Sequence, residues 1–139
     1  MDALGLTHAR LSSPDAGSAA EVVLVDRVGV LGELYALADL AYVGGGGFGA
    51  AGLHSVLEPA AFGAPVLFGP RHANAREAGE LVAAGAAFEV ASAEEVERIA
   101  GGLADVYEMR HRAGGIARRY VEARLGAAER GAALVAGVL

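Results

Sequence analysis

Short apolar runs alternate with longer segments of helical spacing along this chain, and that alternation is the feature that most limits its possible folds. Runs rich in Val, Leu, Ala and Phe predict strands over residues 21–25, 40–43, 65–69 and 86–90, the first of them buried. Helices are predicted over residues 28–39, 55–63, 74–85 and 92–110, with a last helix from about residue 116 nearly to the C-terminus. This alternation is typical of an α/β fold in three layers, a parallel sheet with helices on both faces.

Several residues mark the expected ends of these helices. Gly63 and Gly85 each follow a helical segment and are predicted to stop it, because glycine readily adopts the left-handed conformation that closes a helix. Ser92 and Glu95 have the Ser-x-x-Glu spacing of a capping box, which predicts the start of the next helix.

The first 20 residues do not fit the alternation. They contain no convincing strand, and the first eleven resemble the tail of a helix followed by a loop. Residues 12–18 form the only linker-like stretch. We therefore expect one domain over residues 1–139, with residues 1–20 as a poorly defined lead-in, and we expect this domain to correspond to the later part of a larger one.

Composition excludes several classes of function. The 139 residues are 54% hydrophobic, which suits a folded domain, and no apolar run approaches the ~20 residues that a bilayer requires. The chain has no Cys, which excludes disulfides, zinc–thiolate sites and Cys nucleophiles, and no Lys, which excludes a Walker A loop. Its net charge of −6 argues against nucleic acid as a partner, although backbone N–H groups can still bind a small anion.

Four consecutive glycines, residues 44–47, follow the second predicted strand and are the main clue to function. Gly44, Gly46 and Gly49 match the G-x-G-x-x-G pattern of dinucleotide-binding folds. The next strand ends without the acidic residue that would hold the ribose, so we do not expect NAD to bind. A tight turn into a short helix instead favours a phosphate site at the helix start, and the 70–77 loop should open onto the same edge of the sheet.

His54 and Glu58 are four residues apart in the predicted helix after the glycines, which would place them on one face. A carboxylate at position 58 could accept both hydroxyls of a ribose whose phosphate lies at the helix start. The same pair has the spacing of metal ligands, but two ligands are too few, so no metal site is expected.

An ordered set of motifs makes this region similar to a known family. "GELYALAD" is followed by Gly-Gly-x-Phe, then His-x-x-Leu-Glu-Pro-Ala, then Gly-Pro with Asn74 and Glu77 beyond it. Over roughly residues 25–90 the chain resembles the C-terminal half of the 3-deoxy-D-manno-octulosonic acid (Kdo) transferases. The resemblance implies a GT-B glycosyltransferase with two Rossmann-like domains, which moves Kdo from CMP-Kdo to a lipid A precursor in lipopolysaccharide biosynthesis without a metal or other cofactor.

The resemblance also implies which residues bind the donor, CMP-Kdo. They are Gly45, Gly46, Gly47 and Phe48 beside the phosphate and sugar, His54 and Ser55 as helix caps, Glu58 on the ribose, and Asn74 and Glu77 facing the cleft. Gly32 and Glu33 match a family motif that borders the same cleft. Arg71 and His72 follow a Gly-Pro turn, and are either further contacts to the anionic donor or simply solvated.

The chain departs from the family in two ways, of which only the second limits these expectations. Gly47 stands where the commonest family motif has Ser, and Ser55-Val56 stands where it has Asn-Pro. The family's acceptor domain, membrane-associating region and catalytic carboxylate precede the matching segment. We therefore expect no catalytic residue here, an inactive isolated chain on the cytoplasmic side, and lipid A and membrane contacts only through the absent N-terminal region.

A missing edge strand would expose apolar sheet surface and favour a homodimer. Two other readings remain open. The donor could be a UDP-sugar, as in related GT-B enzymes, or the chain could be a non-catalytic nucleotide-binding or interaction module.

Overall fold

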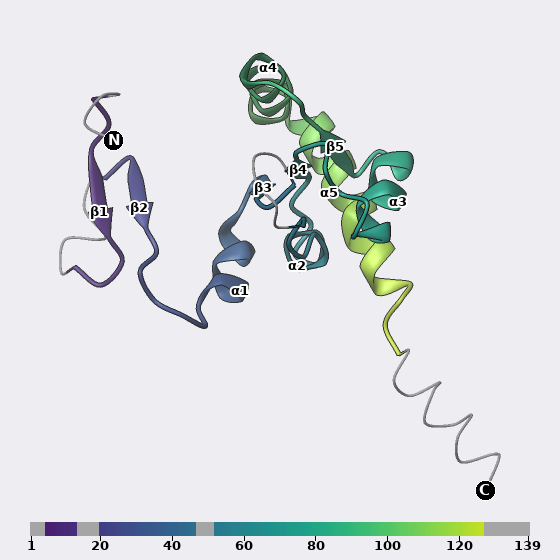
Figure 1. Ribbon diagram of the computed structural model, residues 1–139, viewed down its shortest axis with the longest axis horizontal. Helices are drawn as coiled ribbons and strands as arrows, with labels where there is room; N and C mark the ends of the chain where they lie inside the picture. The colour runs from purple at the N-terminus through teal and green to yellow at the C-terminus, as the bar shows by residue number, and fades with distance from the viewer. Residues whose placement is uncertain (1–4, 14–19, 47–51, 127–139) are drawn as a thin grey trace, which may run out of the picture. The chain divides into compact units, whose positions relative to one another are not determined.

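The computed structural model describes residues 5–13, 20–46 and 52–126 (Figure 1). The chain divides into two compact units, Met1–Leu34 and Tyr35–Leu139, and each is described by itself. The single domain expected over residues 1–139 stays a prediction. In the part of the chain that the structure describes, no helix has the length and apolar character needed to cross a membrane.

The first unit contains two short parallel strands. β1 (His8–Arg10) pairs with β2 (Val22–Leu24), with His8 opposite Val22 and Arg10 opposite Leu24. The absence of a strand from the first 20 residues was therefore a wrong expectation. β1 has only three residues, and two of them are His8 and Arg10. Its sequence therefore contains no repeat of apolar residues from which a strand could be predicted.

Polar side chains at both ends hold these two strands together. The Glu21 carboxylate accepts hydrogen bonds from the Thr7 N–H (2.9 Å) and hydroxyl (3.0 Å). At the other end, Asp26 accepts from the Ser12 N–H (3.1 Å) and hydroxyl (2.6 Å). These bonds lower the pKa of both carboxyls.

β2 lies within the predicted strand 21–25, but the expectation that it is buried was wrong. Val23 and Leu24 are 41% and 42% exposed, because the described residues of this unit place no second layer over them.

The predicted helix 28–39 is shorter than expected and divides between the units. α1 (Leu31–Leu34) ends the first unit, and the 3-10 helix η2 (Tyr35–Leu37) begins the second. Gly29 has a φ of 88°, which a right-handed helix does not allow, so the helix begins only after it.

The second unit is built on a three-stranded parallel sheet in the order β3-β4-β5. β3 (Ala41–Val43), β4 (Val66–Phe68) and β5 (Ala87–Glu89) lie in register, with Ala41, Val66 and Ala87 in one row. All three residues of β4 are buried, as expected for a central strand with both faces covered.

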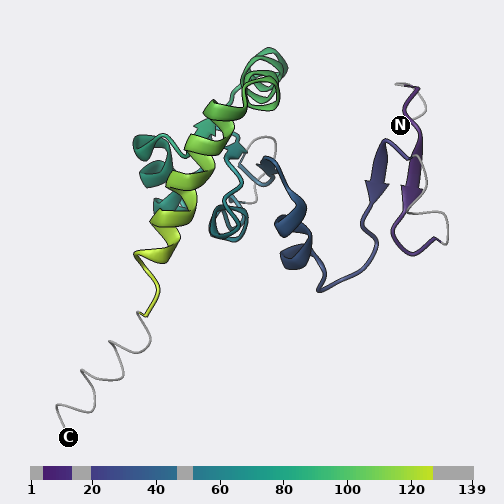
Figure 2. The same ribbon diagram turned by 180° about the vertical axis from the view of Figure 1, so that it is seen from behind.

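Helices cover the two faces of this sheet (Figures 1 and 2). Val66 and Phe68 face a core formed with α2 (Leu57–Ala61), α3 (Arg76–Ala84) and α5 (Tyr107–Glu122). Leu67, between them in β4, points to the other face, where Leu103 and neighbouring apolar residues of α4 (Ala93–Asp105) pack. The predicted three-layer α/β fold is therefore confirmed.

Three of the predicted helix ends are confirmed. Gly63 and Gly85 have φ values of 81° and 78° and follow α2 and α3. At the start of α4 the Ser92 hydroxyl accepts from the Glu95 N–H (3.2 Å), while the Glu95 carboxylate accepts from the Ala91 N–H (2.7 Å). The capping interaction thus includes the residue before Ser92.

The predicted boundaries of the last two helices were wrong. The helix expected to continue to residue 110 ends at Asp105, and α5 begins at Tyr107 rather than near residue 116. Val106 between them is extended, with φ −108° and ψ 96°. The break has a clear reason, because α4 covers one face of the sheet and α5 the other, so the chain must cross between layers.

Candidate functional site

The loops after β3 and β4 meet at the carboxyl-terminal edge of the sheet, as predicted. The Arg71 N–H donates to the Gly46 carbonyl (2.7 Å), which ties the two loops together. The His54 N–H donates to the Gly44 carbonyl (3.2 Å) and so brings the segment before α2 to the same place. Ligands of open parallel α/β sheets bind at this edge.

The bare backbone of Gly45 and Gly46 lies against other backbone. Gly45 has a φ of 91°, and a Cβ there would be 2.4 Å from the Gly52 carbonyl oxygen. A Cβ on Gly46 would be 3.1 Å from the Gly69 carbonyl oxygen, and Gly46 itself is buried. Gly44 is exposed and would accept a Cβ with nothing within 4 Å. Part of the glycine run is thus required by the chain's own packing. Gly47 and Phe48 lie outside the described residues.

Asn74, predicted to face the donor, has its carboxamide engaged with the backbone of Leu53. Its Oδ1 accepts from the Leu53 N–H (3.0 Å), and its Nδ2 donates to the Leu53 carbonyl (3.1 Å). A Cβ on Gly52 would be 2.6 Å from the Asn74 Cγ, so the contact also needs a glycine at position 52. Asn74 therefore positions residues 52–54. Its direct contact with a donor stays a prediction.

The predicted start of α2 was wrong, and with it the caps. α2 begins at Leu57, its N-cap is Val56, and no side chain caps it, so Ser55 and His54 precede the helix. Val56 is 2% exposed, so core packing determines where the helix begins. His54 and Glu58 consequently do not share a helix face.

Glu58 lies in the first turn of α2 and is exposed. Its charge acts on Tyr35 of η2: burial first, and the Glu58 carboxylate second, raise the pKa of the Tyr35 hydroxyl. Glu58 is therefore an accessible acceptor at the start of α2.

His72 is held in place at the same edge by two contacts. Its Nε2 lies 2.8 Å from the Glu89 Oε2, and its ring meets the Phe68 ring edge-on at 5.1 Å between centroids. Glu89 was missed in the sequence analysis. Its position as the last residue of β5 was an available signal, since the carboxyl ends of all three strands meet here.

The other predicted residues lie in α1, in α3 and in the loop after β4. Glu77 lies in the first turn of α3 and is partly buried, and the Arg71 side chain is exposed. Gly32 and Glu33 belong to α1 of the first unit, so their place beside a donor stays a prediction. Within the described ranges, no group of three or more His, Cys, Asp or Glu side chains could hold a metal ion.

Comparison with known proteins shows what this chain is similar to. No family profile matches the chain. Curated 3-deoxy-D-manno-octulosonic acid transferases are similar to it: that of Aquifex aeolicus is 43% identical over 77 residues, which are 55% of this chain and 22% of that protein. That of Bordetella pertussis is 38% identical over 96 residues, which are 67% of this chain and 22% of that protein. The chain thus spans about a fifth of the length of these relatives.

A solved structure agrees with the sequence relatives. The C-terminal CMP-Kdo binding domain of WaaA from Acinetobacter baumannii superimposes with a TM-score of 0.76 and 27% identity. The match covers 85% of this chain and 62% of that chain.

Proposed function

We propose that this chain, which resembles the C-terminal CMP-Kdo-binding domain of the Kdo transferases in sequence and in fold, binds the nucleotide of CMP-Kdo at the carboxyl-terminal edge of its second sheet. The observation that carries the proposal is the match to the Acinetobacter domain, whose own name includes CMP-Kdo binding. The loops that meet at this edge contain backbone N–H groups and polar side chains, which can bind a nucleotide sugar.

The glycine loop is our proposed phosphate site. The exposed backbone at Gly44 leaves room for a phosphate to approach, and Gly45 and Gly46 hold the turn through their close packing. Gly47 and Phe48 would extend this surface to the sugar. Backbone N–H groups can bind a phosphate in a protein whose net charge is −6.

The other proposed contacts divide into binding and positioning roles. Glu58 would accept the ribose hydroxyls, since an ionised carboxylate has two acceptor oxygens. His72, oriented by Glu89, would face the anionic part of the donor together with Arg71 and Glu77. Asn74 would act indirectly, because it fixes the backbone at Leu53 next to His54.

Kdo transfer itself is proposed only for a longer protein that contains this domain, because the chain spans about a fifth of its transferase relatives. In that protein other segments would supply the catalytic carboxylate and would contact the lipid A precursor and the membrane at the cytoplasmic side. The homodimer expected for this chain also stays a prediction.

The proposal is tested by an NMR titration of the whole chain with CMP, and with UMP and NAD for comparison. We expect CMP to shift the amides of Gly44–Gly46, His54 and Glu58 at lower concentration than UMP. Glu58→Gln should weaken CMP binding about tenfold, because a hydrogen bond to a charged group contributes about 1.5–3 kcal/mol. Glu97→Gln, on the exposed side of α4, is the matched control and should leave CMP binding unchanged.

Two results would contradict the proposal. One is the absence of CMP-dependent shifts at the glycine loop, which would favour a module with another role. The other is a stronger response to UMP than to CMP, which would favour a UDP-sugar donor.

A further inference from the structure

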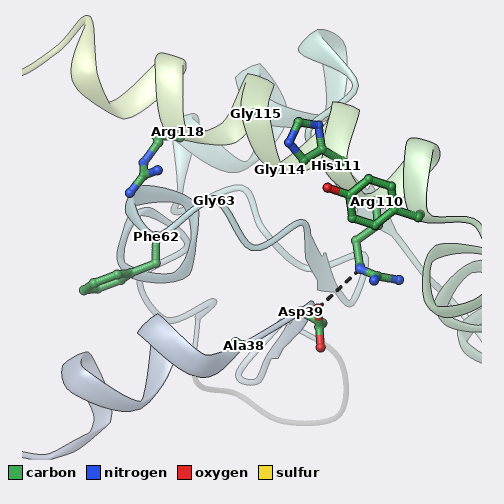
Figure 3. Close-up of a pocket in the computed structure, with 10 residues that line it drawn as sticks. Ala38, Asp39, Phe62, Gly63, Arg110, His111, Gly114, Gly115 and Arg118 are labelled. Atoms are coloured by element: carbon green, nitrogen blue, oxygen red, sulfur yellow. Dashed lines mark ion pairs between the residues drawn. The ribbon is translucent and has the colours of Figure 1, made fainter.

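A pocket lies at the edge of the same sheet opposite the candidate donor site, within the second unit (Figure 3). Its volume is about 270 Å³. It is lined by Ala38 and Asp39, just before β3, by Phe62 and Gly63, before β4, and by one face of α5. These residues precede their strands, so the pocket lies at the amino ends of the sheet, away from the candidate donor site.

The α5 wall is a notch between a histidine and an arginine side chain. His111, Gly114, Gly115 and Arg118 follow the i, i+3, i+4, i+7 spacing of one helix face. Figure 3 shows His111 and Arg118 on either side of the two glycines. The notch is open because no side chain projects from positions 114 and 115.

Only one of the two glycines is explained by packing. A Cβ on Gly114 would lie 2.0 Å from the Gly63 carbonyl oxygen, so α2 and α5 can approach only if this residue is glycine. A Cβ on Gly115 would meet nothing closer than the Arg119 guanidinium at 3.3 Å, the flexible end of a side chain. A glycine within a helix costs about 1 kcal/mol relative to Ala. Glycine at position 115 leaves the notch open.

The single acidic residue that lines the pocket in the described structure is already paired. Asp39 lies 3.4 Å from the Arg110 Nε, and Arg110 also donates to the carbonyls of Leu103 (2.8 Å) and Ala104 (2.7 Å) at the end of α4. Arg110 and Asp39 thus form an ion pair with each other, and Arg110 also binds the chain where α4 ends and α5 begins.

Arg118 and His111 form weaker interactions within the protein. The Arg118 Nε lies 3.8 Å from Glu122, and both side chains are 58% exposed, so this ion pair contributes little. The His111 ring stacks on Tyr107 with centroids 5.4 Å apart, which fixes its orientation at the pocket. The pocket therefore presents a guanidinium and an oriented imidazole in a protein whose net charge is −6.

We propose that this pocket binds a phosphate monoester through Arg118 and His111. The guanidinium presents several N–H donors in a plane, a geometry that matches phosphate oxygens, and a phosphate monoester carries about −1.5 to −2 charges at neutral pH. The volume of the pocket lies below the range of roughly 300–1,000 Å³ that is usual for sites of drug-sized ligands. The pocket therefore suits the phosphate ester of a small alcohol better than a nucleotide. Phe62 and Tyr107 supply apolar surface at the rim.

The test is an NMR titration of the whole chain with glycerol 3-phosphate and with inorganic phosphate. We expect shifts at Gly63, His111, Gly114 and Gly115. Arg118→Gln should weaken binding about tenfold, whereas Arg112→Gln, on the same helix but outside the pocket, should change it less than twofold. Gly115→Leu fills the notch while Arg118 and His111 remain, and should weaken binding by a similar factor to Arg118→Gln.

Vesicles distinguish the source of the phosphate. Retention on phosphatidylcholine vesicles that contain phosphatidic acid, lost in Arg118→Gln, would assign the site to a lipid headgroup. Shifts from glycerol 3-phosphate without such retention would assign it to a free ester.

The proposal is overturned if neither the soluble phosphates nor the acidic vesicles bind, or if Arg112→Gln weakens binding as much as Arg118→Gln. Glu58→Gln, which tests the donor site, should leave this binding unchanged, so the two proposals fail independently.

Discussion

The two units of this chain are held together by different interactions. In the first unit, β2 exposes Val23 and Leu24, and the strands β1 and β2 are joined at both ends by carboxylates that accept from Thr7 and Ser12. In the second, β4 is buried on both faces under two layers of helices. The chain thus combines a unit stabilised by ionised hydrogen-bond acceptors with a unit stabilised by apolar burial.

The second unit also contains carboxylate interactions, but they supplement its core. Glu80 of α3 accepts from Tyr120 of α5 and from Arg76 and Arg124. These hydrogen bonds, that of Tyr120 foremost, lower the pKa of Glu80 to about 2. Burial and the hydrogen bond to Glu80 raise the pKa of Tyr120 to about 12. The network joins α3 to α5 above a core that is already packed.

The largest expected effect is a cavity in the second unit. Leu81 of α3 is fully buried, so Leu81→Ala should lower the free energy of unfolding by about 2–5 kcal/mol through lost burial and an unfilled cavity. Urea denaturation followed by circular dichroism measures it. Val82→Ala, next to it but 38% exposed, is the control and should cost less than about 1 kcal/mol. Equal losses in the two variants would contradict the proposed role of burial.

A smaller effect is expected where α2 meets α5. Gly114→Ala places a Cβ 2.0 Å from the Gly63 carbonyl oxygen, so the helices must separate, and a cost of about 1–3 kcal/mol is expected in the same denaturation experiment. Gly79→Ala in α3 meets nothing within 4 Å and should instead stabilise the protein by up to about 1 kcal/mol. A stabilising Gly114→Ala would show that the contact between α2 and α5 is looser than described.

The next prediction compares two serines at helix starts. Ser92 accepts from the Glu95 N–H, so Ser92→Ala should cost about 1 kcal/mol. Ser55 precedes the N-cap of α2, and α2 has no side-chain cap, so Ser55→Ala should change the free energy of unfolding by no more than about 0.5 kcal/mol. A larger loss from Ser55→Ala than from Ser92→Ala would restore the helix start that the sequence predicted.

Local patterns predicted the elements of the second unit well, because there the apolar period and the core agree. α3 illustrates this, since its helical spacing and the left-handed Gly85 are both written in consecutive residues. The start of α2 was not predictable in this way, since the buried Val56 and not a polar cap determines it. The break at Val106 likewise depends on which face of the sheet each helix covers.

The candidate site shows the same division. The sequence located the glycine loop and the 70–77 loop at one edge, because the carboxyl ends of parallel strands must meet there. It did not identify the partners of the predicted residues, which lie far along the chain: Asn74 bonds Leu53, and His72 meets Glu89. Those pairings depend on the register of the sheet and on loop packing, which no local pattern encodes.

The smallest expected effect concerns acid and the first unit. Glu21 and Asp26 have pKa values lowered by their hydrogen bonds to Thr7 and Ser12, so their contribution is fully present above the ordinary values of 4.5 and 3.8. It is lost as the pH falls through the lowered values of the folded state. The protection factors of the Val22 and Leu11 amides, which donate to the Thr7 and Leu24 carbonyls across the strand pair, should therefore fall on acidification below about pH 4, the protection factor being the intrinsic exchange rate at each pH divided by the observed rate.

Core amides of the second unit are the internal reference for this measurement. The Val66 N–H, which donates to Ala86, should stay protected over the same pH range because apolar burial around it does not titrate. Asp26→Asn should reproduce part of the acid effect at neutral pH, since an amide oxygen accepts more weakly than a carboxylate. Simultaneous loss of protection in both units would show that they unfold as one and that the contrast between them does not govern stability.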